Sequence, residues 1–241
     1  IEPEFPDVII DTLAYHYSRP APKHIRPRKN VCVRLCSIES CFSHPFEICD
    51  DKSREVTLPD GSTSSFIHDL KEWAKICNRL YIWDYTTCFS HYPLPFPNWN
   101  VLQPNMQTFI KNNVKGVFEQ GCRALGGSTD LNELRAYLIA KLLWDANCDY
   151  ERHMNEFLEY YYGQAAPFIR EYIKTITDKV EKENIHCYIF DHCDRADLTD
   201  EMLDIYDNLF DEAEEAVRGD PIRAARVAKA RLSIRWVRLK K

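Results

Sequence analysis

The chain has 241 residues, of which 45% are hydrophobic and 28% are charged, and its formal net charge is −6 at pH 7. This length is enough for one sizeable core, or for one core with a helical addition. The acidic balance argues against a general nucleic-acid binder, and no apolar run approaches the ~20 residues of a membrane-spanning helix. We therefore expect a soluble globular protein that has neither nucleic-acid nor membrane partners.

Four short apolar runs predict β-strands, and segments with helical periodicity separate them. The runs are Asp7–Tyr15, Val31–Ile38, Leu80–Tyr85 and Val114–Glu119. The helical segments are Ser65–Asn78, Gln103–Asn112 and Asp130–Leu143. In the first of these, Phe66, Leu70 and Trp73 fall on one face, after Ser and Thr residues that favour a helix start. Such an alternation is typical of a parallel sheet covered on both faces.

After Trp144 the sequence predicts helices only. The expected helices are Tyr150–Tyr162, Ala165–Glu183, Thr199–Arg218 and Pro221–Leu239. Gly163 suits a helix end, and Pro221 suits a first helical turn. The third of these helices is acidic and the fourth is strongly basic, so we expect an antiparallel hairpin with complementary charges. A basic tail that binds anionic partners is the alternative.

Four βα units are half of a (β/α)8 barrel, whose closed form takes about 250 residues. Four parallel strands with two bare edges would be prone to aggregation unless the edges were paired or covered. We therefore predict an α/β fold in which residues 1–147 are the C-terminal half of a (β/α)8 TIM barrel and residues 148–241 form an α-helical domain.

The chain begins without an initiator Met. We expect the missing barrel half in an omitted N-terminal segment, in another chain or in a second copy. A self-sufficient doubly wound sheet is the alternative fold. Such a sheet usually binds a nucleotide, but no GxGxxG or P-loop pattern opens any helix here. We therefore expect no cofactor.

Polar side chains stand where each predicted strand ends, and a barrel carries its site at these carboxyl ends. They are Tyr15 and His16 after the first strand, Glu39 and His44 after the second, Trp83, Asp84 and Tyr85 at the third, and Glu119 and Gln120 at the fourth. Asp and Glu are seldom buried unless they are paired or functional. Asp84 and Glu119 are therefore the candidate catalytic residues, and the others are candidates for substrate binding.

Glycoside hydrolysis needs two carboxyl groups, about 5–5.5 Å apart for retention and about 6.5–9.5 Å apart for inversion. Asp84 and Glu119 lie on consecutive strand ends, so such a spacing is within reach. The alternatives are a hydrogen-bonded loop anchor for Asp84 and a salt bridge to Arg34 or Arg123 for Glu119.

Aromatic rings and prolines crowd the stretch LYIWDYTTCFSHYPLPFPN, residues 80–98. Trp83, Tyr85 and His91, with Trp99 just beyond, offer flat faces for the C–H patches of a sugar ring. The prolines would keep the loop rigid, so that little entropy is lost on binding. Arg34 and His44 are candidates for a substrate carboxylate, because Arg offers a planar fork of donors. In the alternative interpretation, the rings plug the barrel or hold its missing half.

The ten cysteines lie mostly in strand-like or helix-like runs, which favours buried thiols in a reduced, cytoplasmic compartment; a secreted or periplasmic parent is the alternative. The spacing Cys36-x4-Cys41-x2-His44-x4-Cys49 offers zinc ligands, but it is not a regular finger or ribbon pattern. We therefore predict no metal. A disulfide, buried thiols and a Cys41/His44 nucleophile pair are the alternatives.

Several stretches resemble the bacterial family labelled domain of unknown function 4838. They are LAYHYSRPAPKHIRPRKNVCVRLCSIESCFSHP, YIWDYTTCFSHYPLPFPNWNVLQPN, KGVFEQG and ELRAYLIAKLLWD, and the resemblance covers roughly residues 5–175. That family occurs largely in polysaccharide-degrading bacteria. At the level of the barrel it is similar to the α-glucuronidase and β-N-acetylhexosaminidase groups of glycoside hydrolases.

The two groups imply different roles for the same residues. Resemblance to α-glucuronidases implies that Asp84 and Glu119 form the base that activates water. Resemblance to hexosaminidases implies that Trp83, Asp84 and Glu119 hold sugar hydroxyls. In both comparisons the general acid would lie upstream of Ile1.

The resemblance therefore implies part of a glycoside hydrolase-like protein with a carbohydrate substrate, a uronic-acid or acetamido-sugar glycoside, and a chain that is inactive alone. A non-catalytic carbohydrate-binding barrel and a scaffold without a ligand are the alternatives.

Overall fold

The computed structural model describes residues 3–122 and 130–241. The chain is α/β and divides into two compact units. The sheet unit comprises residues 1–41, 45–86 and 104–120, and the helical unit comprises residues 42–44, 87–103 and 121–241. Among the residues that are described, no helix is both long enough and apolar enough to cross a membrane.

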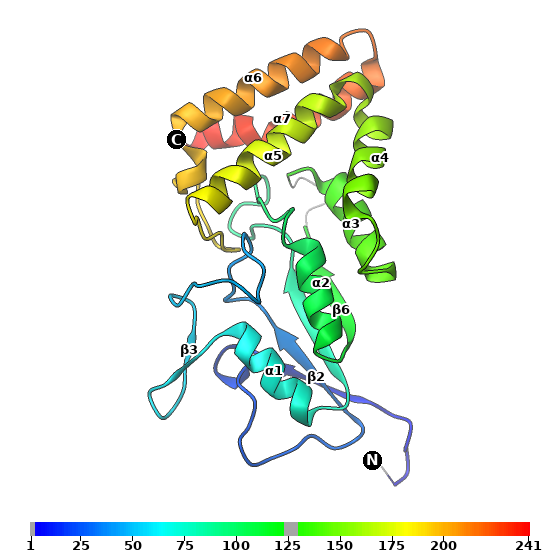
Figure 1. The fold of residues 1–241 in the computed structure, drawn as a ribbon, viewed down its shortest axis with the longest axis vertical. Helices are drawn as coiled ribbons and strands as arrows, with labels where there is room; N and C mark the ends of the chain where they lie inside the picture. The colour runs from blue at the N-terminus through cyan, green and yellow to red at the C-terminus, as the bar shows by residue number, and fades with distance from the viewer. Residues whose placement is uncertain (1–2, 123–129) are drawn as a thin grey trace. The chain divides into compact units, whose positions relative to one another are not determined.

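The sheet unit is built on four parallel strands in the order β1-β2-β5-β6 (Figure 1). Their bounds are Ile10–Ala14 for β1, Val31–Cys36 for β2, Leu80–Tyr85 for β5 and Val114–Gln120 for β6. These are the four strands that the apolar runs predict, and the prediction of a parallel sheet is confirmed. β1 and β6 form the two edges, and no other strand in the described ranges pairs with them.

Two helices cover one face of this sheet. α1 (Phe66–Ile76) and α2 (Leu102–Lys111) lie on the same side of the strands in Figure 1. The Ser65 side chain accepts a hydrogen bond from the His68 N–H and so caps α1, as the sequence predicts. Beneath the helices Leu35, Leu80 and Ile82 are at most 1% exposed, and they form the core of this unit.

The opposite face of the sheet is less covered than the sequence predicts. Because successive strand residues alternate between faces, Arg34, Tyr81 and Trp83 point away from Leu35 and Ile82. All three are partly exposed, and Phe118 on β6 is 47% exposed. We call this side, with Arg34, Tyr81, Trp83 and Phe118, the open face. In the described residues of this unit both helices lie on the other side, so the expected cover on both faces is absent.

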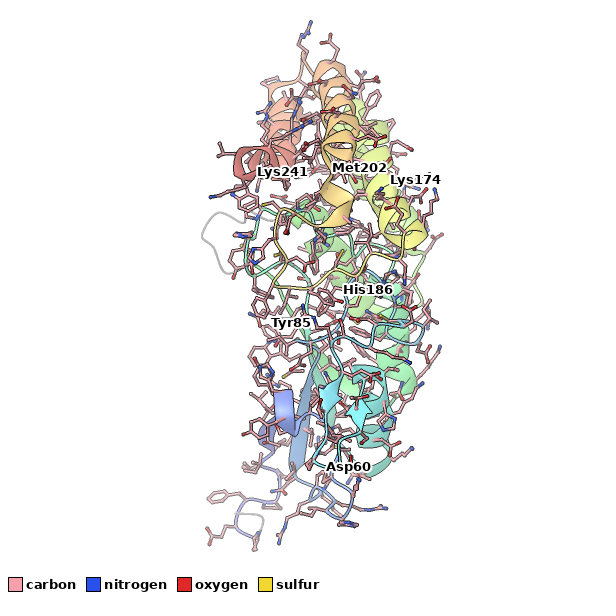
Figure 2. The ribbon with its side chains drawn as sticks, turned by 90° about the vertical axis from the view of Figure 1, so that its left-hand side faces the viewer. Asp60, Tyr85, Lys174, His186, Met202 and Lys241 are labelled. Carbon is pink, nitrogen blue, oxygen red and sulfur yellow. The ribbon has the colours of Figure 1, made fainter. Side chains whose placement is uncertain are left out.

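A short antiparallel hairpin, β3 (Val56–Thr57) and β4 (Thr63–Ser64), precedes α1 and was not predicted. Gly61 in its turn has φ of +83°, a conformation that Gly adopts without steric cost. Figure 2 labels Asp60 in this turn, where its side chain accepts hydrogen bonds from Ser62 and Lys23. The hairpin supplies the Ser64 carbonyl that is used below.

The helical unit contains α3 to α7, and its helices match the predicted segments closely. Their bounds are Asn132–Trp144, Tyr150–Tyr162, Ala166–Lys182, Asp200–Ala216 and Pro221–Lys240. The predicted hairpin of complementary charge is confirmed, because Arg231 of α7 donates to Asp207 and Asp211 of α6. Lys241, beyond the end of α7, reaches Asp200 at the start of α6, as an antiparallel pair requires.

Candidate functional site at the strand ends

Asp84 on β5 and Glu119 on β6 are in-register neighbours on adjacent parallel strands. Neighbouring strands lie about 4.8 Å apart, and paired residues project to the same side of the sheet. The Asp84 side chain is 6% exposed. Oε2 of Glu119 is buried and has no hydrogen-bond partner among the described residues. The strand pairing therefore places two carboxyl groups side by side in a location with little water.

This location is on the helix-covered side of the sheet. Asp84 follows Leu80 and Ile82 at the two-residue interval that keeps a side chain on one face, whereas Trp83 and Tyr85 point the other way. The Ser37 hydroxyl, just beyond β2, donates to Oδ1 of Asp84 at 2.5 Å. Asp84 thus also links the end of β2 to the end of β5.

Burial raises the pKa of Asp84 to about 6, although hydrogen bonds from the Ser37 hydroxyl and the Tyr85 backbone N–H work against this rise. The pKa of Glu119 is raised well above its usual range, first by burial and then by the charge of Asp84. Two adjacent carboxyl groups cannot both ionise easily. The pair therefore keeps a proton to higher pH than two isolated carboxyl groups would.

Glu39 organises a second polar group near the ends of β1 and β2. Its Oε1 lies 2.6 Å from Nδ1 of His16, and its Oε2 lies 3.1 Å from Nη1 of Arg19. The rings of Tyr15 and His16 are in edge contact, with centroids 3.9 Å apart. His16 has φ of +49°, in the left-handed region that few non-glycine residues occupy. The contact with Glu39 is one interaction that holds His16 in this strained conformation.

Arg19 is a residue that the sequence analysis missed. Its side chain is 1% exposed, and its Nε donates to Oδ2 of Asp69 at 2.6 Å. Its Nη2 donates to the Ser64 carbonyl at 2.6 Å. Arg19 therefore connects Glu39 to the β3–β4 hairpin and to α1. The only local signal for it is a single Arg before a Pro, which says nothing about burial.

Tyr85 brings the two polar groups within electrostatic reach of each other. Figure 2 labels this residue, which is the last of β5 and is 7% exposed. Burial raises its pKa, and the charges of Tyr15, Asp84 and Glu39 add to the rise. We call Tyr15, Glu39, Asp84, Tyr85 and Glu119 the strand-end cluster. All five are among the residues selected from the sequence, and the structure brings them together within the sheet unit.

The open face presents aromatic rings on the side of the sheet opposite to Asp84 and Glu119. Trp83 Nε1 donates to Oε1 of Gln120 at 2.6 Å, which fixes the indole at the end of the sheet. The Phe118 ring meets Trp83 edge-on, with centroids 5.3 Å apart. Tyr81 lies against Gly116, where an added Cβ would come within 3.1 Å of the Tyr81 ring. The result is a row of rings over three residues of β5 and β6, with an amide at its end.

Arg34 has a different partner from the one that the sequence suggests. Its Nη2 lies 2.6 Å from Oδ2 of Asp11 on β1, so it is held at the middle of the sheet. No salt bridge joins Arg34 to Glu119 in the described residues, and Arg123, the other suggested partner, lies outside them. The substrate-carboxylate role of Arg34 would require it to exchange Asp11 for a ligand.

The last two predicted binding residues, His44 and His91, belong to the helical unit. The His44 ring contacts the His186 ring. Nε2 of His91 lies 3.1 Å from Nδ1 of His192, and the His91 ring also contacts Trp236. Trp99 is 2% exposed under the Arg135 guanidinium, so it offers no face to a sugar.

The arrangement places a carboxyl pair on the helix-covered side of the strand ends and a flat apolar surface on the open face. The pKa values of Asp84 and Glu119 are both raised, so this pair is suited to proton transfer, and the open face carries rings with an adjoining amide. A family model matches residues 1–174, and its description is Domain of unknown function (DUF4838). No curated protein and no solved structure matches the chain.

Proposed function

Because the chain belongs to the family of the domain of unknown function (DUF4838), whose name states no chemistry, we infer its function from its own residues. We propose that it is part of a glycoside hydrolase-like protein that acts on polysaccharide-derived sugars bearing a uronic acid or an acetamido group. The observation that carries this proposal is the neighbouring pair Asp84 and Glu119, whose pKa values are both raised.

A general base works best when its pKa lies close to the pH at which the enzyme operates. Asp84, with a pKa of about 6, meets this condition near neutral pH. In the proposed reaction, a water oxygen attacks the anomeric carbon and the Asp84–Glu119 pair accepts the water proton. The C–O bond to the leaving group breaks, and an acid from another strand protonates the departing oxygen. This chain alone would then be inactive.

The proposal includes a barrel of which this sheet is the C-terminal half. The open face would line the barrel interior, while Asp84 and Glu119 point to the helix-covered side and would reach the substrate only where the strands end. The edges β1 and β6 would pair with a preceding segment of a longer chain or with a second copy. Trp83 and Phe118 would contact the C–H face of the sugar, while Gln120, Tyr15, His16 and Glu39 would bind its hydroxyls. Fold analogy alone does not establish a reaction, so the proposal of hydrolysis depends on the carboxyl pair Asp84 and Glu119.

One observation favours a second candidate function, a carbohydrate-binding barrel without hydrolysis. Asp84 lies on the helix-covered side of β5 and accepts the Ser37 hydroxyl, so it also serves as a structural anchor. In that case the open face would bind sugars, and the buried carboxyl pair would only set the spacing of the strand ends.

A sugar-release assay on the parent protein separates the two functions. Uronic-acid and acetamido glycosides are the substrates, with the parent protein compared to Asp84→Asn, Glu119→Gln and this chain alone. Matched controls are Asp194→Asn and Glu159→Gln, which change exposed carboxylates of the helical unit. Hydrolysis predicts that turnover falls by about 10³-fold or more in at least one site variant and stays unchanged in both controls.

Two outcomes of the assay would contradict the hydrolytic function. If the parent turns over a glycoside and both site variants keep the full rate, Asp84 and Glu119 have no part in catalysis. If the parent releases no sugar but gains thermal stability in the presence of one, the binding function replaces the hydrolytic one.

A further inference from the structure

The basic helix α7 carries two apolar stripes, and only one of them is buried in the helical unit. The buried stripe contains Val227, Ile234 and Val237, which have no exposed surface. In the other stripe, Leu232 is 52% exposed and Leu239 is 82% exposed. Figure 1 shows α7 in red along α6, to which the ion pairs described above join it. The core of the unit does not use the exposed leucines, so they are available to a ligand.

A pocket lies between this exposed stripe and the loop that carries Pro93. Its volume is about 350 Å³. Pockets for small molecules occupy about 300–1,000 Å³, so this one is at the lower end of that range. All of its described lining residues belong to the helical unit, and all except Pro93 lie on α7. We call it the α7 pocket.

The indole of Trp236 is a wall of the α7 pocket that neighbouring side chains hold in place. The Trp236 and His91 rings have centroids 4.8 Å apart. Nε2 of His91 in turn lies 3.1 Å from Nδ1 of His192. Nζ of Lys240 lies 6.0 Å from the centroid of the indole. Because these contacts exist without a ligand, binding costs little conformational entropy at this wall.

The lining of the α7 pocket suits an apolar ligand body better than a sugar. Leu232, Trp236, Leu239 and Pro93 contribute mostly carbon atoms. Among the lining residues that are described, Ser233 has the only hydroxyl, and this residue is buried. A sugar ring would leave most of its hydroxyls here without hydrogen-bond partners, and each such group costs free energy.

The rim of the α7 pocket is positively charged. Lys229 lines it and also pairs with Glu133, yet its side chain remains 40% exposed. Arg235 lines it and also pairs with Glu214, and its side chain remains 54% exposed. Both cations can therefore contact a second anion. No carboxylate is among the described residues that line the pocket.

The pKa of His91 reports the same positive field beside the pocket. This pKa is lowered, first by burial and then by the charges of His192 and Lys240. A field that disfavours one more cation favours an anion. The ligand that complements both the wall and the rim therefore combines an apolar body with a negative charge.

We propose that the α7 pocket binds a small carboxylic acid with an aliphatic or aromatic body. The apolar body lies against Leu232, Trp236 and Leu239, and the carboxylate contacts Lys229 and Arg235. The site is independent of the proposed function, because all of its residues belong to the helical unit and the strand-end cluster belongs to the sheet unit.

Isothermal titration calorimetry of the 241-residue chain with octanoate tests the proposal. Octanoate should bind at about one site per chain, with a Kd between about 10 μM and 1 mM. Octanol has the same chain length without the charge, and it should bind about three- to tenfold more weakly. High salt should reduce this difference, because it screens the contacts of the carboxylate with the exposed cations.

Two variants change the wall and the rim separately. Leu232→Glu places a negative charge on the apolar wall and should weaken octanoate binding about tenfold or more. Arg235→Gln should weaken octanoate binding about two- to fivefold and leave octanol binding unchanged. The matched controls are Leu143→Glu, at a similarly exposed leucine of α3, and Arg218→Gln, at an exposed arginine outside the pocket, and both should bind octanoate normally. All four side chains are exposed, so the variants should fold.

Three results of the titrations would each overturn the proposal: no binding up to about 5 mM octanoate, equal affinity for octanoate and octanol, or an equal loss of affinity in Leu232→Glu and Leu143→Glu. Two further measurements identify a different occupant. Sedimentation of the chain with phosphatidylglycerol vesicles, without octanoate binding, would assign the stripe to a lipid surface. A dimer that Leu232→Glu dissociates, again without octanoate binding, would assign it to a second copy, and either outcome would overturn the proposal.

Discussion

The buried carboxyl of Asp84 should make the stability of this chain fall as the pH rises. The pKa of Asp84 is raised from its ordinary value of 3.8 to about 6, chiefly by burial. A raised pKa means that the folded chain binds this proton more tightly than the unfolded chain does. The associated stabilisation is fully present below about pH 4 and is lost as the pH rises through about 6.

The size of the effect follows from the shift. Each pKa unit corresponds to 1.36 kcal/mol, so a rise from 3.8 to about 6 is equivalent to about 3 kcal/mol in the free energy of unfolding. Glu119, whose pKa is also raised, makes the stability fall with rising pH in the same way. Asn at position 84 cannot ionise, yet its amide oxygen still accepts a hydrogen bond from Ser37. Asp84→Asn should therefore remove the Asp84 part of the pH dependence and keep the link to β2.

Urea denaturation of the chain and of Asp84→Asn at intervals between pH 4 and 8 measures this directly. From the lowest to the highest pH, the variant should gain about 3 kcal/mol of unfolding free energy relative to the unaltered chain. Asp194→Asn, at an exposed carboxylate, should run parallel to the unaltered chain. If the unfolding free energy of Asp84→Asn also changes with pH as that of the unaltered chain does, Asp84 is not a buried carboxyl with a raised pKa. Its proposed role as a base near pH 6 would then be wrong.

Two further predictions concern ion pairs. Replacement of Arg19 by Met should lower the free energy of unfolding by about 3–5 kcal/mol, because it leaves Asp69, 1% exposed, without its cation; Lys23→Met, at an exposed pair with Asp60, should change it little. The idea fails if the two variants lose the same stability in urea melts. Arg231→Met should cost about 1–3 kcal/mol, since Arg231 donates to Asp207, Asp211 and Glu214 at once; Arg235→Met, with one exposed contact to Glu214, should cost less. High salt should narrow the difference in unfolding free energy between Arg231→Met and Arg235→Met. A difference that grows with salt would argue against an electrostatic origin.

The positions of the strands and helices could be predicted because their signals are local. The run Leu80–Tyr85 is a strand within the bounds that its residues suggest, and Tyr150–Tyr162 is a helix within its own. Ser65 caps its helix as the sequence predicts, and Thr199, where the third of the C-terminal helices was expected to begin, caps α6. The β3–β4 hairpin was missed because each of its strands has only two residues, too few to show an alternating pattern.

The residues of the candidate site could be selected from the sequence, but their surroundings could not. Period-two alternation requires that Trp83 and Asp84 point to opposite faces of the sheet. It does not say which face the helices cover. The packing of α1 and α2 against Leu35 and Ile82 decides this, and it buries Asp84 while leaving Trp83 on the open face.

The sequence by itself therefore determined the order of strands and helices, the parallel sheet and the choice of Asp84 and Glu119, because these depend on residues close together in the chain or on a general rule of strand ends. Tertiary structure alone decided that Arg19 meets Asp69, that Arg34 meets Asp11, and that His186 joins His44. The partners in these pairs are separated by long stretches of chain. Only the folded backbone brings them together, so no local pattern carries their signal.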